Sequence, residues 1–306
     1  MARLGSESKA GFYATPPYEL ELLLQRILPE EGNKNGDCLS YFLYDPCCGE
    51  GEALLMIAQA LQGPNRSVIT YGSEIEAGRA EEASRVLDHV IHDGYQRVRA
   101  EAKFSLLWLN PPYQTNVDGE RAELSFLRAL TDFKKGVLQK GGLLLFCIPQ
   151  YVLTDTAGLL SGRFRDISVY RFTDEHYDNF KQVIVVARYE RAPRGEQTRM
   201  YRALQTLGNG DRTLLPTLEE VAPFIVPSAL STEPPYFRRD ALDVEELNKD
   251  LECSSLFQEM RKSLVPTSNE TKLKRPMLPL KPAHMGIALA AGAVGGNMGS
   301  HSAHCS

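Results

Sequence analysis

The sequence predicts an α/β fold, a doubly wound and mostly parallel sheet of about seven strands, followed by an irregular C-terminal region. Two observations predict this class. Between about residues 39 and 188, unbroken apolar runs typical of buried strands alternate with segments of helical spacing, as in a parallel sheet covered by helices on both faces. Beyond about residue 190, frequent prolines interrupt this alternation.

The elements follow one another in chain order. Strands are expected at LSYFLYD (39–45), SVITYGSEI (67–75), the short run before IHDGY (91–95), FSLLWLN (104–110), GGLLLFCIP (141–149), DISVYRF (166–172) and KQVIVVARYE (181–190). Helices are expected at GEALLMIAQALQ (51–62), EAGRAEEASRVLDHV (76–90), ELSFLRALTDFKKGVLQ (123–139) and near 155–163. Since the last two strands leave no room for a crossover helix, they are expected to form an antiparallel pair at one end of the sheet.

This change of sequence pattern predicts that the chain has two parts, with a boundary near residues 190 to 196. Residues 1–190 would form the α/β domain, and residues 191–306 a proline-rich accessory or recognition region. One main helix is expected there at about 240–264, followed by an extended stretch at 265–282 and a flexible tail.

Composition excludes several classes of protein. Hydrophobic residues make up 43% and charged residues 24% of the 306 residues, as in ordinary globular proteins. The N-terminus lacks the apolar segment of a signal peptide and no run is long enough to span a bilayer, so a cytoplasmic protein without membrane association is expected. Six cysteines without C-x-x-C pairs argue against zinc and disulfides, and no metal is expected.

Charge is unevenly distributed along the chain. Residues 1–187 carry 19 Lys and Arg against 25 Asp and Glu, and residues 188–306 carry 15 against 14, which together give the net charge of −5. A chain of this charge would not hold nucleic acid tightly by electrostatics alone. The basic runs at 188–202 and 261–281 are either solvated faces or contacts to phosphates.

The stretch LLWLNPPYQ (106–114) ends a buried strand in an unusual way. Pro111 and Pro112 fix two φ angles and favour an extended Asn110, so Asn110 and Tyr113 would be held rigidly at the carboxyl end of the strand. In an open α/β sheet this end is where ligands bind. From these residues alone, an ordinary Asn-Pro turn is an equal alternative.

A second stretch, YDPCCGEGEALL (44–55), places Asp45 at a strand end and Gly49 and Gly51 in the turn before a helix. Glycines there allow a ligand to approach the backbone and the free N–H groups of the helix. The pattern is not that of a phosphate-binding P-loop. Glu74 ends the next strand, where its carboxylate could either bind a ribose diol or be stabilised by the dipole of the following helix. Asp93 could accept a hydrogen bond from an adenine amine.

Together these residues resemble class I S-adenosyl-L-methionine-dependent methyltransferases, specifically the N6-adenine methyltransferases whose motifs run in the γ order. The resemblance covers roughly residues 11–190, from GFYATPP through DPCCGEG, Glu74, Asp93 and NPPY to ELSFL, GGLLLFCIP and FKQVIVVARY. It implies a Rossmann-like class I methyltransferase fold with S-adenosyl-L-methionine as the cofactor. The implied cofactor-binding residues are Tyr13, Thr15, Pro16, Asp45, Pro46, Cys47, Gly49, Gly51, Glu74, Ile75, Asp93 and Asn110, and the implied catalytic residues are Asn110, Pro111, Pro112 and Tyr113.

The resemblance also implies a mechanism. The Asn110 side-chain oxygen and the Pro111 carbonyl would accept the two N–H bonds of the adenine amine and aim its nitrogen at the methyl group, while Tyr113 would stack on a base flipped out of the duplex. One departure is Phe104-Ser105, where the family often has Phe-Asp.

The expected substrate is adenine in DNA, with a possible protein partner that supplies target recognition. RNA adenine and a protein glutamine amide also present a weakly nucleophilic nitrogen, so both stay open as alternative substrates. A non-catalytic nucleic-acid-binding module in a larger complex is a third alternative, which the intact NPPY disfavours. A dehydrogenase is a poor alternative because the glycine turn is not G-x-G-x-x-G and NPPY would have no role in it.

Overall fold

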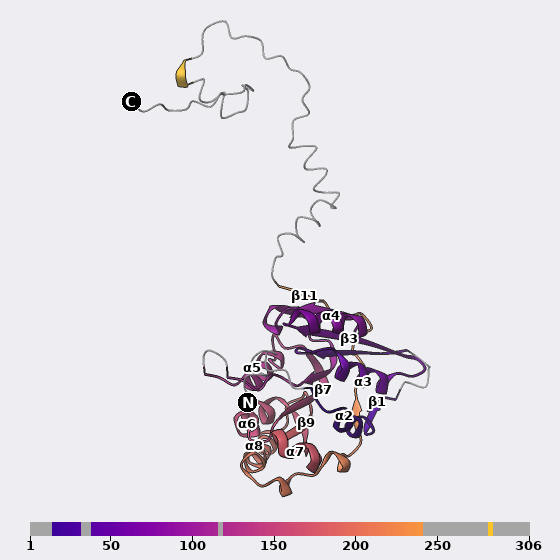
Figure 1. Cartoon of the computed structure of the whole chain (residues 1–306), viewed down its shortest axis with the longest axis vertical. Helices are drawn as coiled ribbons and strands as arrows, with labels where there is room; N and C mark the ends of the chain where they lie inside the picture. The colour runs from indigo at the N-terminus through magenta and orange to yellow at the C-terminus, as the bar shows by residue number, and fades with distance from the viewer. Residues whose placement is uncertain (1–13, 32–37, 116–118, 241–280, 284–306) are drawn as a thin grey trace. The chain divides into compact units, whose positions relative to one another are not determined.

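The computed structural model describes residues 14–31, 38–115, 119–240 and 281–283 (Figure 1). The chain divides into two compact units, Met1–Leu242 and Asp243–Ser306, and the elements below all belong to the first. Tyr13 and nearly all of the helix predicted at about 240–264 lie outside the described residues.

A seven-stranded sheet forms the centre of the first unit, with the strand order β4-β3-β2-β6-β7-β9-β8. Its members are β2 (Leu39–Asp45), β3 (Arg66–Glu74), β4 (His89–His92), β6 (Phe104–Leu109), β7 (Leu138–Pro149), β8 (Arg165–Arg171) and β9 (Gln182–Arg188). The pairs among β4, β3, β2, β6 and β7 are parallel, and β9 is antiparallel to both β7 and β8. The predicted fold class is confirmed, and so is the predicted antiparallel pair, which is formed by β8 and β9. Strand β9, which is antiparallel to both of its neighbours, lies one place inside the edge of the sheet, and β8 forms the edge.

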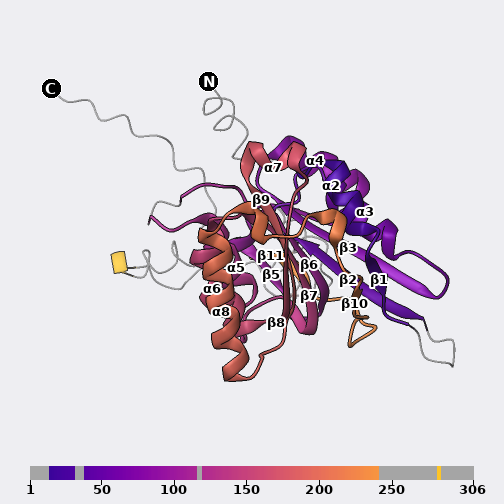
Figure 2. The ribbon, with the colours of Figure 1, turned by 90° about the horizontal axis from the view of Figure 1, so that it is seen from below.

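Helices cover the sheet on both sides. Figure 2 shows α3 (Glu52–Leu61) and α4 (Ala77–Val86) on one side, and α5 (Ala122–Leu130), α6 (Val152–Arg163) and α8 (Arg194–Asn209) on the other. All six residues of β6 are buried between these layers, which explains its continuous apolar run. Of the helices in the described part of the chain, none has the length and apolar character needed to cross a bilayer.

Two predicted segments are corrected by the structure. The helix expected at 123–139 ends at Leu130 and β7 begins at Leu138. The chain turns tightly between them at Gly136, where a Cβ atom would lie 2.4 Å from the Asp132 carbonyl oxygen. A short helix that was not expected, α7 (Asp174–Phe180), fits between β8 and β9. Its first turn is acidic, with Asp174 and Glu175, and this complements the helix dipole.

The compact unit extends beyond the boundary predicted near 190 and reaches Leu242. Helix α8 lies in a segment that was predicted to be irregular, because the prolines on either side of it concealed Met200, Leu204 and Leu207 at helical spacing. Further on, β10 (Phe224–Val226) pairs with β1 (Ile27–Pro29), and β11 (Phe237–Arg239) pairs with β5 (Val98–Ala100).

The remaining helices are short. Helix α2 (Pro17–Leu24) precedes the sheet, and three 3₁₀ turns lie at Tyr95–Arg97, Arg212–Leu214 and Leu218–Glu220.

Candidate active site

The predicted polar residues gather at the carboxyl edge of the parallel strands. Asp45 and Glu74 end β2 and β3, Asp93 follows β4, and Asn110 follows β6. Two adjoining cavities open there, and Cys47 and Asn110 line both. The sheet topology therefore brings together four residues that are up to 65 positions apart in the sequence.

The first cavity has a volume of about 220 Å³. Seven predicted site residues line it, namely Pro46, Cys47, Glu74, Ile75, Asp93, Asn110 and Pro112. Ile75 is 67% exposed despite being aliphatic, so it offers an apolar wall to a ligand. Tyr95 and Phe126 also line the cavity, with ring centroids 3.9 Å apart, and neither was predicted.

Glu74 is tied to the glycine turn and to the start of α4. Its carboxylate accepts hydrogen bonds from the Gly49 N–H at 3.0 Å and the Glu76 N–H at 2.9 Å. The Arg79 guanidinium donates to the same group at 2.8 Å, and both side chains are almost buried. These bonds fix the Glu74 carboxylate at the wall of the first cavity.

Asp93 is held by its own loop and by a distant strand. The Gly94 N–H donates to Oδ1 at 2.8 Å, and the Arg239 Nε of β11 donates to Oδ2 at 2.7 Å. Partial burial raises the pKa of Asp93, but the bonds from Arg239 and Gly94 outweigh it and hold this pKa below its usual value. Asp93 is therefore a carboxylate at neutral pH.

The second cavity has a volume of about 70 Å³ and is lined by Thr15, Asp45, Cys47 and Asn110 among others. Asp45 is 3% exposed, and the Cys47 N–H donates to it at 3.0 Å. Burial, with a smaller contribution from the nearby Glu74 charge, raises the pKa of Asp45 to about 7. Among the described residues no cation forms an ion pair with it.

The glycine turn brings the N-terminus of α3 close to these cavities. Gly49 and Gly51 have positive φ angles of 56° and 87°. A Cβ atom on Gly51 would also lie 2.9 Å from a methyl carbon of Val86, so glycine is needed there for two reasons. Neither glycine lines a cavity. Instead they place Cys47, whose thiol donates to the Asn110 carbonyl oxygen at 3.2 Å.

The loop after β6 contains a hydrogen-bond network around Asn110. Its Nδ2 donates to the Thr15 hydroxyl at 3.2 Å, and its Oδ1 accepts from the Tyr113 hydroxyl at 3.1 Å. The Nε2 of Gln182, at the start of β9, donates to the Tyr113 hydroxyl at 2.6 Å. The two bonds of Asn110 orient its amide, with the oxygen toward Tyr113 and the nitrogen toward Thr15.

Tyr113 differs from the expectation that it stacks on a flipped base. Its hydroxyl points into the fold, toward Asn110, Gln182 and Cys147. Burial raises the pKa of Tyr113 well above its usual value, so the hydroxyl stays protonated and donates. An enclosed tyrosine hydroxyl needs hydrogen-bond partners, and this requirement fixes the orientation seen here. Pro111 is buried beside it and lines neither cavity.

Two further residues near this loop were not predicted. Gln182 lies within FKQVIVVARY, a motif that the resemblance identified without assigning a role to this position. Glu123, in the first turn of α5, is fully buried, and within the part of the chain that the structure describes its two carboxyl oxygens have no hydrogen-bond partner. Burial raises the pKa of Glu123. A lone glutamate in a helical pattern gives no sign of such burial, so the sequence could not have revealed it.

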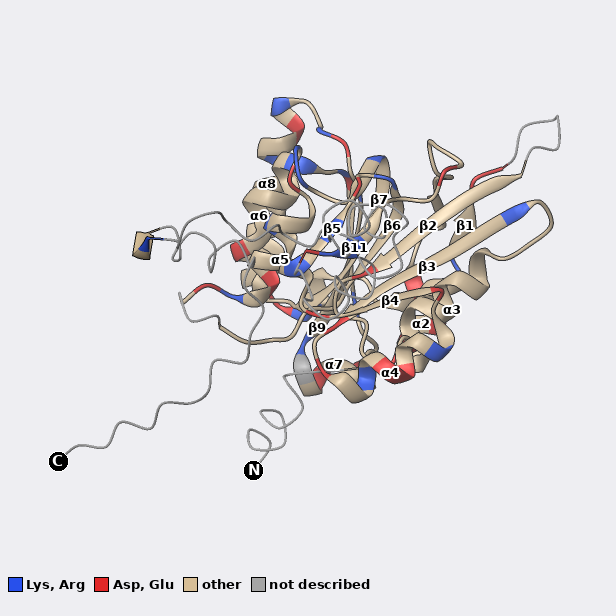
Figure 3. Ribbon diagram, turned by 90° about the horizontal axis from the view of Figure 1, so that it is seen from above, with Lys and Arg blue, Asp and Glu red and all other residues tan. Residues whose placement is uncertain are grey.

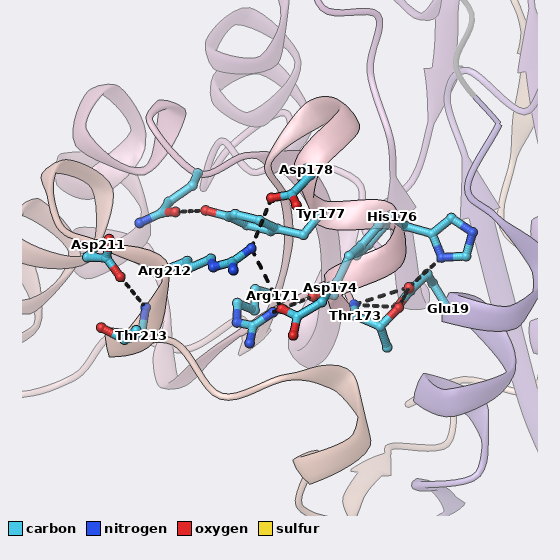
Figure 4. A network of polar contacts seen from close by, with 12 residues as sticks. Glu19, Arg171, Thr173, Asp174, His176, Tyr177, Asp178, Asp211, Arg212 and Thr213 are labelled. Carbon is cyan, nitrogen blue, oxygen red and sulfur yellow. Dashed lines mark hydrogen bonds and ion pairs between the residues drawn. The ribbon is translucent and has the colours of Figure 1, made fainter.

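The N-terminal segment is fixed to this edge by a buried carboxylate. Pro16 precedes α2 directly. On α2, Glu19 accepts hydrogen bonds from the Thr173 N–H at 3.1 and 3.2 Å and from the Thr173 hydroxyl, and it contacts the Nδ1 of His176 at 2.8 Å (Figure 4). This network ties α2 to the corner that precedes Gln182, so the segment that carries Thr15 and the strand that carries Gln182 are held together at this edge.

No metal centre is visible in the described part of the chain. Residues 14–31, 38–115, 119–240 and 281–283 contain no group of three or more His, Cys, Asp or Glu side chains that could hold an ion.

Comparisons with known proteins place this arrangement in context. The model of an uncharacterised methyltransferase family, DUF6094, matches residues 1–224. A search of curated proteins found no match.

Solved structures with a similar fold share little sequence with the chain. A class I S-adenosylmethionine-dependent methyltransferase from Listeria monocytogenes is 12% identical with a TM-score of 0.44, over 63% of this chain and 68% of that one. A type I restriction-modification methyltransferase subunit from Streptococcus thermophilus is 15% identical with a TM-score of 0.40, over 60% and 45%. An rRNA methylase from the same species is 15% identical with a TM-score of 0.37, over 59% and 100%. Similarities of this size say nothing about the substrate.

Proposed function

The chain belongs to the methyltransferase family DUF6094, and from this premise we propose that it transfers a methyl group from S-adenosyl-L-methionine to the N6 amine of adenine in DNA. The predicted enzyme class and cofactor agree with the family. The observation that carries the finer proposal is the position of Asn110, which lies where the two cavities meet and whose amide is oriented by Thr15 and Tyr113.

The residues present fit the cofactor. The first cavity combines the carboxylates of Glu74 and Asp93 with the apolar Ile75, which suits a ribose diol, an adenine amine and an adenine ring. The second cavity contains the buried Asp45, whose raised pKa shows that a cationic partner would stabilise its charged form. The ammonium group of the methionine moiety is such a partner. When bound, the cofactor supplies an electrophilic methyl group on a sulfonium.

The chain's own residues then act on the nucleophile. An adenine amine is weakly nucleophilic because its lone pair is delocalised into the ring. The Asn110 Oδ1 and the Pro111 carbonyl would accept its two N–H bonds and orient the nitrogen. Because Thr15, Tyr113 and the prolines hold these acceptors in advance, they need little reorganisation during the reaction.

Exposed arginines support nucleic acid as the substrate. Arg194, Arg199 and Arg202 are exposed on α8, where Glu196 is the one acidic residue, and Figure 3 shows basic residues along this helix. Tyr201, on the same helix, is 45% exposed. Arginines beside an exposed aromatic ring suit a phosphate backbone with unstacked bases. A protein partner that supplies target recognition, and a cytoplasmic location, belong to the same proposal.

The test is methyl transfer from labelled S-adenosylmethionine to unmethylated duplex DNA, to RNA and to a protein extract in parallel. We expect label in DNA, recovered as N6-methyladenine, and its loss in Asn110→Ala. Asn209→Ala is the matched control, because Asn209 lies exposed at the end of α8.

The other outcomes decide between the alternatives. Label in RNA, or in a glutamine amide, would keep the chemistry and replace the substrate. Binding of the cofactor without label in any substrate would contradict the proposal and favour a non-catalytic binding module.

A further inference from the structure

Strand β11 reaches the cofactor cavity from beyond the family-matched residues. The family model ends at residue 224, and β11 comprises Phe237–Arg239. The strand pairs antiparallel with β5, with Arg239 opposite Val98, and the Asp240 N–H donates to the Arg97 carbonyl at 2.6 Å. Its last residue is thereby placed beside the loop that carries Asp93.

Three independent contacts fix β11 there. The Phe237 ring packs against Tyr44, Tyr71 and Phe104, with centroids 5.5, 5.1 and 6.4 Å away. The Tyr236 N–H donates to the Glu101 carboxylate at 3.0 Å. At the other end Asp240 forms an ion pair with Arg99. Arg239 therefore approaches Asp93 from a strand held by its neighbours, and not from a free tail.

The contact with Asp93 leaves the carboxylate in a defined orientation. Oδ1 is held by the Gly94 N–H at 2.8 Å and Oδ2 by the Arg239 Nε at 2.7 Å, while the Arg97 guanidinium lies 3.8 Å from Oδ2. A carboxylate has about four lone-pair sites, so these two hydrogen bonds leave capacity for another donor. Asp93 lines the first cavity, so that capacity is available to a ligand there.

We propose that Arg239 is a positioning residue for cofactor recognition, which holds the Asp93 carboxylate in place and aims it at the amine of the cofactor's adenine. The inference rests on the cofactor site of the proposed function and is independent of the substrate that is methylated. It assigns a role at the active site to a strand that the family model does not include.

The proposal makes a specific statement about ligand discrimination. An oriented carboxylate accepts a hydrogen bond from a 6-amino group and repels the oxygen of a 6-oxo group. Loss of Arg239 lets the carboxylate rotate away from this orientation, so the preference for the amine weakens. If β11 only stabilised the fold, loss of Arg239 would weaken the binding of the 6-amino ligand and of the 6-oxo ligand equally.

The experiment measures the binding of S-adenosylhomocysteine and of its 6-oxo counterpart, S-inosylhomocysteine, by calorimetry with the full chain and without substrate. We expect Arg239→Leu to weaken binding of the adenine ligand by about tenfold, the size expected for one charge-assisted hydrogen bond, and to change binding of the 6-oxo ligand little. Arg239→Lys should recover part of the discrimination. Arg238→Leu is the matched control, because Arg238 lies 4.4 Å over the Tyr236 ring instead.

Equal losses for both ligands in Arg239→Leu, or no loss for either, would overturn the inference while leaving the methyltransferase proposal intact. A wild-type chain that binds neither ligand would overturn the cofactor site and the inference together. A thermal unfolding curve of each variant separates these results from misfolding.

Discussion

At the scale of single residues, the active site depends on the order of donors around Asn110. Gln182 donates to Tyr113, Tyr113 donates to Asn110, and Asn110 donates to Thr15. An amide can be rotated by 180° with little change in shape, so this order fixes the oxygen toward Tyr113 and the nitrogen toward Thr15. The oxygen end is the one that can accept from an amine.

We expect Tyr113→Phe to lower kcat by about tenfold, because a hydrogen bond that orients the acceptor is lost. The KM for S-adenosylmethionine should stay within about twofold, since the cofactor carboxylates are untouched. Gln182→Leu should lower kcat by a smaller factor. Steady-state kinetics of both variants and of the double variant checks the idea. If the network acts as a unit, the double variant is no slower than Tyr113→Phe, whereas multiplied losses would show that the two residues act independently.

Asp45 gives the cofactor site a pH dependence. Its pKa is about 7 in the folded chain, so the side chain is mostly neutral at pH 6 and mostly charged at pH 8. Only the charged form attracts an ammonium group. Cofactor affinity should therefore fall as the pH is lowered through about 7, by up to about tenfold between pH 8 and pH 6.

Calorimetric titration of S-adenosylhomocysteine at the two pH values measures this change. The Asp45→Asn variant should bind S-adenosylhomocysteine weakly at both pH values, with no difference in affinity between them. A pH dependence that persists in Asp45→Asn would assign it to a group other than Asp45, and not to Asp93, whose pKa is held low.

At the scale of elements, the sequence predicts the sheet well and the C-terminal strands poorly. Strands β2, β3, β6 and β7 each contain a run of apolar residues, and the strands end at the same edge because they are parallel. Strands β5 and β11 have three residues each, too few to show a period of two. Their pairing joins residues more than 130 positions apart, which a single sequence does not reveal.

The contrast between local sequence pattern and contacts made on folding also explains which candidate site residues could be predicted from the sequence. Asp45, Glu74, Asp93 and Asn110 stand at the ends of recognisable strands, so their position follows from local pattern. Arg239 and Gln182 act through contacts made only in the folded chain. The inward orientation of Tyr113 depends on Gln182 and Cys147, and no local rule predicts it.

Phe237 should contribute to stability through its contacts with three strands. Its ring packs against Tyr44 of β2, Tyr71 of β3 and Phe104 of β6. Because the side chain is only partly buried, Phe237→Ala should lower the free energy of unfolding by about 2 kcal/mol, less than a fully buried phenylalanine would. Urea denaturation measures this value. Leu230→Ala, at a site that is 76% exposed, is the control, and an equal effect in both variants would contradict the packing role of β11.

At the scale of the whole molecule, the first compact unit is longer than the family match. Beyond residue 224, Ile225 and Val226 pair with β1, and Phe237–Arg239 pair with β5. Between them, Gln139 of β7 donates from Nε2 to the Ser228 carbonyl at 2.7 Å and accepts from the Leu230 N–H at 3.0 Å. The first compact unit ends at Leu242. Because of these contacts, the stability of the sheet depends on the segment that ends at Arg239.

Two truncated chains test where the active unit ends. A chain of residues 1–242 should unfold at nearly the temperature of the full chain and bind S-adenosylhomocysteine with the same affinity, because every contact described at the cofactor site is retained. A chain of residues 1–224 lacks Phe237 and Arg239, so it should unfold several degrees lower, by about 5 °C or more, and bind the ligand at least about tenfold more weakly. Differential scanning fluorimetry with and without the ligand measures both quantities. If the shorter chain matched the longer one, the family-matched residues would be sufficient for the site, and if residues 1–242 failed to bind, part of the site would lie beyond Leu242.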